Sequence, residues 1–284
     1  MPADGTPFVR DGRHVLEAGD VRFEADAALG GRVTALSFAG RELLVGSDTD
    51  TVNFGSTFWT SPQEHWGWPP LVEIDSSPYE ASIDGAAIVM LGPVCPTLRV
   101  AIEKRFRAAP ERGTLSLEYR IHNRSHAPVR LAPWQVTRVR PNGLTFFASG
   151  ATHARSNLPV DDAGGVTWFS HAVDRVDGHQ KLFADAREGW IAHLDGDVLL
   201  VKTFALVGSE AQAPGEAQIE IYASTMHRYV EVEVQGAYEV IQAGEALEWT
   251  VDWWLRRVPD GVERAQGSAA LPDFVRGMIA AGAP

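Results

Sequence analysis

The sequence of 284 residues is poor in cysteine, in long apolar runs and in basic residues, and each shortage excludes a class of protein. Its single cysteine, Cys95, cannot form an internal disulfide, which fits a reducing compartment. No stretch reaches about 18 consecutive apolar residues, and the first residues lack the charged-then-apolar layout of a secretory signal. We therefore expect a cytoplasmic protein that does not span a membrane.

Basic residues are outnumbered, because 25 lysines and arginines stand against 37 aspartates and glutamates, for a formal net charge of −12. Nucleic acids and anionic lipid surfaces are bound by clustered lysines and arginines, and the chain has no basic run. We therefore expect neither nucleic acid nor a membrane as a partner. The sequence carries no signal for an oligomeric state.

Motifs for metals, cofactors and the common nucleophiles are also missing. There is no HExxH, no paired CxxC and no Asp-rich calcium loop. There is no GxSxG elbow, no Walker loop and no dinucleotide fingerprint after a strand. We expect a protein that uses neither a metal nor an organic cofactor.

What the sequence has in abundance is a periodicity of two residues. In LRVAIEKRF (98–106) and LSLEYRI (115–121) the apolar residues share one parity, and the APERG turn between these segments predicts a β-hairpin. The one segment with strong helical periodicity is LPDFVRGMIAAGA (271–283). Further strand-like runs lie at 32–38, 86–91, 128–136, 189–194, 198–206, 217–223, 229–235 and 247–255.

So many short strands without intervening helices predict an all-β protein, an antiparallel sandwich or barrel with a short C-terminal helix. No break in composition and no internal repeat of about 20–50 residues divides the chain. We expect an N-terminal extension at 1–14, one β-domain at 15–258 and a C-terminal tail that carries the helix at 259–284.

A polar face runs along YVEVEVQ (229–235). Alternation sends its valines to one side, and successive side chains on the same side lie about 6.5–7 Å apart. The run at 217–223 repeats the arrangement, so this face is either the solvated side of a sheet or the floor of a cleft with a carboxylate base. The polar face carries Gln218, Glu220, Tyr222, Tyr229, Glu231, Glu233 and Gln235.

Three of the nine tryptophans lie in WTSPQEHWGWPP (59–70), which we interpret as a loop stiffened by glycine and proline. Such a loop loses little entropy when it presents Trp59, Trp66 or Trp68 to a ligand. Indole faces pack against the C–H faces of sugar rings, and nearby Glu, Gln and His bind hydroxyls, so the composition favours a neutral polyol. The alternative is that these tryptophans fill an open end of the sandwich as core.

Several segments together resemble the galactose mutarotase-like superfamily. GGRVTALSFAGRELL (30–44) is similar to its opening hairpin and PVRLAPWQVTRV (128–139) to its central strand. Residues 230–255, with VEVEVQ, an AGE turn and a final strand ending in aromatics, resemble its closing section. The pieces FWTSPQ and WGWPP look more like the DUF4380-type branch than like true aldose 1-epimerases. The resemblance covers roughly 15–257 and implies a large antiparallel β-supersandwich with a sugar cleft on one sheet.

The resemblance also implies roles for single residues. Epimerases of this superfamily use a late glutamate as general base, and Glu233 stands at its position. Trp134 stands where their central strand has a histidine, so we expect the acid to be His65 or His227, whereas His153 is expected to be a solvated loop residue. The residues expected to contact the substrate are Trp59, Gln63, Trp66, Trp68, Trp134, Gln135, Arg138, Lys202, Glu231 and Gln235.

These expectations favour a carbohydrate-active protein that takes a small-molecule sugar or an oligosaccharide as its partner and converts a sugar anomer, or a related sugar, by acid–base chemistry. One alternative is a non-catalytic carbohydrate-binding protein. Another is a lyase or hydrolase of glycosidic bonds, in which Glu64 would face a carboxylate of the 229–235 strand across the bond. Lys202 either faces outward from its strand or supplies a cation to the cleft.

Overall fold

The structure is a computed structural model that describes residues 4–172 and 175–282, without the side chains of residues 151–155. Most regular elements in this part of the chain are β-strands. The first ten are β1 Phe8–Arg10, β2 Arg13–Ala18, β3 Val21–Asp26, β4 Arg32–Phe38, β5 Arg41–Glu42, β6 Ser56–Ser61, β7 Glu80–Asp84, β8 Ala87–Leu91, β9 Val100–Ala109 and β10 Thr114–Asn123. The next ten are β11 Val129–Val139, β12 Leu144–Ser156, β13 Asp161–Ala163, β14 Val166–Ser170, β15 Gln180–Asp195, β16 Val198–Phe204, β17 Ile219–Ala223, β18 Val230–Gln235, β19 Glu239–Ile241 and β20 Ala246–Arg257. The α-helices are α1 Val72–Asp75 and α2 Ala270–Gly282.

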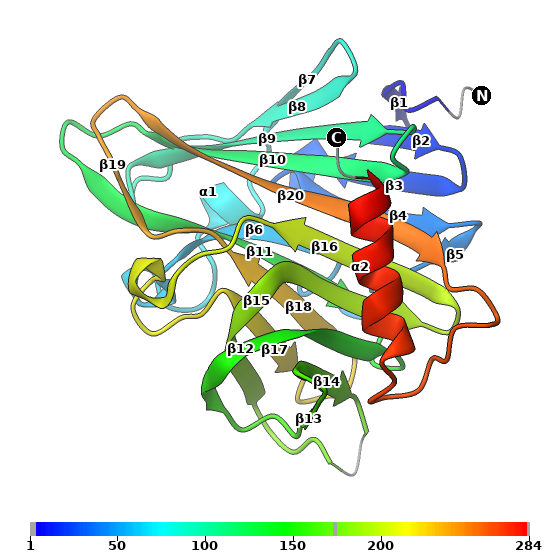
Figure 1. Ribbon diagram of the computed structural model, residues 1–284. Coiled ribbons are helices and arrows are strands. Elements are labelled where there is room, and N and C mark those ends of the chain that lie inside the picture. The colour runs from blue at the N-terminus through cyan, green and yellow to red at the C-terminus, as the bar shows by residue number, and fades with distance from the viewer. Residues whose placement is uncertain (1–3, 173–174, 283–284) are drawn as a thin grey trace.

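The strands form two layers of antiparallel pairs (Figure 1). The first layer pairs in the order β2–β3–β4–β6–β11–β18–β17–β15. The second layer pairs in the order β16–β20–β10–β9–β8–β7. The long strand β15 joins the layers, because its first half pairs with β17 and its second half with β16. A sandwich of this kind leaves the outer face of the first layer free to carry a site.

Aromatic side chains from facing strands fill the space between the layers. Phe58 on β6 stacks on Tyr119 of β10 with ring centroids 4.5 Å apart, and Phe23 on β3 lies 5.1 Å from Phe106 of β9. All four rings are buried. Removing such apolar surface from water is the main favourable term in folding, at roughly 25 cal/mol per Å².

The hairpin and the helix predicted from the sequence are both present. β9 and β10 pair antiparallel from Thr114↔Ala109 onward. Helix α2 covers the predicted 271–283 apart from residue 283, which lies outside the described residues, and buries Leu271 and Val275 against the sheet. No helix in the described part of the chain is long and apolar enough to cross a lipid bilayer.

Two segments differ from the expected boundaries. Residues 59–70 are not one loop, because β6 continues to Ser61 and places Trp59 on a strand, opposite Trp134 of β11. Every residue of β6 is buried, so it lacks the apolar and polar alternation that marks a strand in the sequence. In the expected N-terminal extension, β1 pairs with β2, while residues 1–3 lie outside the described residues.

Candidate functional site

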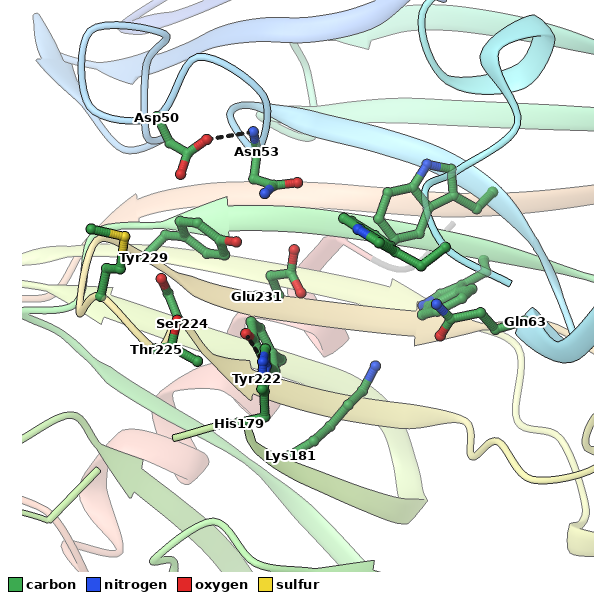
Figure 2. Close-up of a pocket in the computed structure, with 14 residues that line it drawn as sticks. Asp50, Asn53, Gln63, His179, Lys181, Tyr222, Ser224, Thr225, Tyr229 and Glu231 are labelled. Atoms are coloured by element: carbon green, nitrogen blue, oxygen red, sulfur yellow. Dashed lines mark hydrogen bonds between the residues drawn. The ribbon is translucent and has the colours of Figure 1, made fainter. Parts of the chain in front are cut away.

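A cavity of about 470 Å³ opens on the outer face of the first layer (Figure 2). Its floor comes from β11, β18, β17 and the start of β15, and its rim from loops that flank β6. The volume is ordinary for a small-molecule site, which occupies roughly 300–1,000 Å³. The lining residues are Asp50, Asn53, Trp59, Gln63, Trp68, Trp134, His179, Lys181, Tyr222, Ser224, Thr225, Met226, Tyr229 and Glu231.

Strand register brings the polar groups of the floor together. Pairing of β11 with β18 sets Arg138 opposite Glu231, and pairing of β17 with β18 sets Tyr222 opposite Glu231. Pairing of β15 with β17 then sets Lys181 opposite Tyr222. Glu233 follows Glu231 by two residues, and such residues share one face of a strand. One face of four adjacent strands thus carries cations, carboxylates and a phenol.

Tryptophan rings form one wall of the cavity. Trp59 lies edge-on to Trp134 with ring centroids 5.3 Å apart, and edge-on to Trp68 at 6.2 Å. The Trp59 indole N–H donates to Asp75 at 2.8 Å, which fixes the ring. Trp66 is not a lining residue; its ring lies 5.8 Å from that of Trp59, and its N–H donates to a backbone carbonyl. Three of the four expected tryptophans therefore line the cavity, and Trp66 supports them.

Glu231 is the carboxylate at the floor of the cavity, and it lies near the centre of Figure 2. It accepts a hydrogen bond from Arg138 Nε at 2.9 Å. Burial raises the pKa of Glu231 to about 7, although the Arg138 charge opposes the shift. A carboxylate with this pKa takes up and releases a proton near neutral pH, which is the property required of a general base.

Lys181 lies between two buried carboxylates. Its Nζ is 2.7 Å from Glu220 and 3.0 Å from Glu233. Burial acts to lower the pKa of Lys181, but the two carboxylates outweigh burial and raise the pKa above its ordinary value. Lys181 therefore stays protonated, so it is suited to donating hydrogen bonds in the cavity and not to accepting a proton.

Glu233, to which the superfamily resemblance assigns the role of base, is fully buried and does not line the cavity. Its Oε2 accepts hydrogen bonds from the Trp134 indole at 2.8 Å and from Lys181 at 3.0 Å. Gln235 also lies below the cavity surface, where it donates to Glu220 at 2.7 Å. The role of Glu233 as base stays a prediction. In this arrangement its carboxylate holds the lysine and the indole in place.

His179 and Tyr222 form a hydrogen-bonded pair beside the floor carboxylate. The His179 Nδ1 and the Tyr222 hydroxyl are 2.9 Å apart, and the rings stack with centroids at 6.0 Å. Burial raises the pKa of Tyr222, so its hydroxyl keeps its proton at neutral pH. His179 and Lys181 were not predicted to belong to the site. Their segment, GHQKLF, has no recognisable motif, and only the pairing of β15 with β17 brings it to the floor.

The two histidines expected to act as acids do not line the cavity. His65 is exposed at the end of a 3-10 turn at Gln63–His65. His227 lies at the turn before β18, where its Nδ1 is 3.3 Å from Nε2 of His171. Their roles as acids stay predictions. The side chain of His153 lies outside the described residues.

Gln135 and Lys202 point into the space between the layers and not into the cavity. Gln135 donates to the Tyr119 hydroxyl at 2.7 Å and accepts from the Trp253 indole at 3.0 Å. Lys202 donates to a backbone carbonyl at 2.7 Å, and burial lowers its pKa well below the ordinary value. Gln135 is adjacent to Trp134 on one strand, so the two side chains face opposite sides. Lys202 thus neither faces outward nor supplies a cation to the cleft.

Five further loop residues complete the cavity, and none of them was predicted: Asp50, Asn53, Ser224, Thr225 and Met226. Asp50 and Asn53 precede β6, and residues 224–226 follow β17. Asp50 accepts a hydrogen bond from the Asn53 backbone N–H at 2.8 Å, drawn as a dashed line in Figure 2. Polar turn residues of this kind occur in most surface loops.

Among the described residues, no group of three His, Cys, Asp or Glu side chains is placed to hold a metal ion.

The chain matches a protein family over most of its length. Residues 62–256 match the family described as "Domain of unknown function (DUF4380)". No curated protein matches the sequence.

Solved structures share the fold of the chain. A protein from Synechocystis sp. has a TM-score of 0.61 at 14% identity, over 89% of this chain and 98% of that one. A galactose mutarotase-like protein from Clostridium acetobutylicum has a TM-score of 0.58 at 10% identity, over 87% and 95%. Galactose 1-epimerase from Lactobacillus acidophilus has a TM-score of 0.56 at 12% identity, over 89% and 98%. The expected fold, a galactose mutarotase-like β-sandwich, is therefore confirmed.

Proposed function

The chain belongs to the DUF4380 family, and we propose that this member binds a sugar in the tryptophan-lined cavity and converts its anomers, or a related pair of sugars, by acid–base chemistry. The observation that carries the proposal is Glu231, a carboxylate with a pKa of about 7 at the floor of a cavity walled by indole rings. The fold shared with a galactose 1-epimerase supports a sugar as the ligand.

The lining of the cavity suits a sugar ring. Trp68 offers an exposed apolar surface for the C–H face of a pyranose, and the buried rings of Trp59 and Trp134 lie behind it. Gln63, Asn53 and Lys181 supply hydrogen-bond donors and acceptors for its hydroxyls. This combination of an apolar wall with a few polar groups is typical of small-molecule sites, in which the polar groups fix the orientation of the ligand.

In the proposed reaction Glu231 removes the proton of the anomeric hydroxyl. The oxygen electron pair forms the carbonyl at C1, the bond from C1 to the ring oxygen breaks, and that oxygen takes a proton from the His179–Tyr222 pair. Rotation about the C1–C2 bond and closure on the other carbonyl face return both protons and give the other anomer. Lys181, which stays charged, stabilises the negative charge that develops on the ring oxygen.

Glu231 is preferred to Glu233 as the base because of what each carboxylate contacts. The Glu231 carboxylate contacts the Arg138 guanidinium, and Glu231 lines the cavity. Glu233 lies beneath the cavity with Oε2 held by the Trp134 indole and by Lys181. A general base must come within hydrogen-bond reach of the proton that it removes.

Replacement Glu231→Gln tests the proposal. The amide oxygen still accepts a hydrogen bond from Arg138, but the side chain no longer takes up a proton, so we expect kcat to fall by about 10²–10⁴-fold with little change in sugar affinity. The rate is measured by NMR on freshly dissolved α-glucose, α-galactose and other aldoses, and the affinity by calorimetry. Glu80→Gln, on the exposed strand β7, is the matched control.

The outcomes of this experiment test the assignment of the base, the catalytic activity and the binding of sugar separately. A Glu231→Gln protein with the wild-type rate contradicts the assignment of the base. A wild-type protein that binds sugars but does not speed up exchange of their anomers is a non-catalytic carbohydrate-binding protein. A protein that binds no sugar overturns the proposed function.

A further inference from the structure

A second hollow of about 400 Å³ adjoins the candidate cavity. His179 and Lys181 line both hollows, whereas Ser156, Asn157 and Phe183 line only the second. The two hollows therefore meet along the edge formed by His179 and Lys181. A ligand seated in the first hollow reaches the second by extending across this edge.

The combined floor is longer than one sugar ring. β18 pairs with β17, β17 with β15, and β15 with β12, so these four strands are successive neighbours. From Glu231 on β18 to Ser156 on β12 the floor crosses three strand spacings, a distance of about 14 Å. A single pyranose ring is shorter than this, whereas two linked rings span it.

An aromatic ring and a braced amide line the second hollow. Phe183 follows Lys181 by two residues on β15, so both side chains face the same side, and the Lys181 Nζ lies 5.3 Å from the Phe183 ring centroid. Asn157 accepts the Lys181 backbone N–H at 2.8 Å and donates to the His179 carbonyl at 3.0 Å. These bonds fix the amide beside the ring. An aromatic face next to amide, hydroxyl and imidazole groups repeats the chemistry of the first cavity.

We propose that the second hollow is a subsite for a second sugar unit, and that the protein prefers an oligosaccharide to a free monosaccharide as its substrate. The inference rests on the proposed function of the first cavity. The reducing-end sugar occupies the first cavity, where Glu231 acts on its anomeric carbon. The unit linked to it lies over Phe183, with its hydroxyls bound by Asn157 and Ser156.

Calorimetric titration with matched sugars tests the subsite. The pairs are D-glucose with maltose and cellobiose, and D-galactose with β-1,4-galactobiose. We expect the wild-type protein to bind at least one disaccharide about fivefold or more tightly than its monosaccharide, because aromatic contacts add affinity of this size. Phe183→Ala should remove most of that ratio. Phe38→Ala is the matched control, because Phe38 is also partly buried but lies on β4 and lines neither hollow.

The outcomes separate this inference from the proposed function. Monosaccharide binding without a gain from the second ring overturns the subsite and leaves the proposed function standing. A gain that survives in Phe183→Ala also overturns the subsite. Absence of binding to all of these sugars overturns both proposals. Should Phe183→Ala fail to fold, Phe183→Leu removes the flat ring and keeps an apolar side chain.

Discussion

Glu231 and Glu233 stand two residues apart on β18 and face the same side of the sheet, but their surroundings give them different chemistry. Glu231 borders the cavity with Arg138 as its cation. Glu233 is enclosed by the Trp134 indole and the Lys181 ammonium. The sequence places both carboxylates on one face, but it does not tell which of them meets a ligand, because neighbouring strands decide that.

The pH dependence of activity tests the partnership between Arg138 and Glu231. As base, Glu231 acts only when ionised, so kcat/KM should fall as the pH drops through about 7, the pKa of Glu231. The Arg138 charge lowers that pKa, so Arg138→Met should move the acidic limb of the profile to higher pH, by about one unit. The measurement is kcat/KM against pH.

Two further variants control this experiment. Arg130→Met removes an exposed arginine from the same strand, β11, and should leave the profile in place. Arg138→Lys keeps the charge and should shift the limb less than Arg138→Met does. An acidic limb that stays at the wild-type pH in Arg138→Met would show that Glu231 does not control the rate.

Among the elements, the predicted strands include some that alternate between apolar and polar residues and others, such as β8 and β16, that form a continuous apolar run. β9 and β10 alternate clearly, and β18 is buried throughout but still alternates valine with polar residues. β6 and the first half of β12 are buried on both faces without such alternation, so neither was predicted. Burial on both faces removes the alternation, so a buried strand is recognised only where its residues form a continuous apolar run, as in β16.

The site was predictable only where it follows one strand or one loop. Glu231, Trp134 and Trp68 belong to segments with a recognisable pattern, and all three line the cavity. Lys181 and His179 reach the same cavity because β15 pairs with β17 in one particular register. Such a register is fixed by contacts between segments far apart in the chain, so one sequence does not reveal it.

The pairing of β12 with β15 contains a histidine that should make the protein sensitive to acid. His193 on β15 is buried, and its Nδ1 lies 2.9 Å from the Thr145 hydroxyl on β12. Burial lowers the pKa of His193 to about 3, so the unfolded chain takes up this proton first. The buried neutral imidazole of His193 contributes stability above pH 6.5, which is about the pKa of histidine in the unfolded chain. This contribution is lost as the pH falls toward 3.

Unfolding by urea at several pH values tests this sensitivity. Between pH 7.5 and pH 4, His193→Gln should lose about 3 kcal/mol less unfolding free energy than the wild-type protein, because glutamine does not titrate. His126→Gln, at an exposed position, should behave as wild type. Equal losses in the wild-type and His193→Gln proteins would contradict a buried neutral imidazole.

At the scale of the whole molecule, one apolar core extends through both layers. It runs from Leu16 on β2 to Val275 on α2, and β15 passes from one layer to the other. Because the layers share their buried surface, we propose that residues 15–258 fold as one domain, with the tail at 259–284 contributing α2.

Thermal unfolding should accordingly be a single cooperative transition. We expect the calorimetric enthalpy to equal the van't Hoff enthalpy, and the near- and far-ultraviolet circular dichroism to change at the same temperature. Two separate transitions would mean that the layers, or the C-terminal tail, unfold independently.

Trp68 keeps 60% of its surface exposed at the rim of the cavity, while Trp59 and Trp134 beside it are buried. An indole in water emits at longer wavelength and meets dissolved quenchers, whereas a covered indole does neither. A ligand that binds against this wall shields the Trp68 ring from water. The intrinsic tryptophan fluorescence of the protein should therefore shift on binding and report it without an added label.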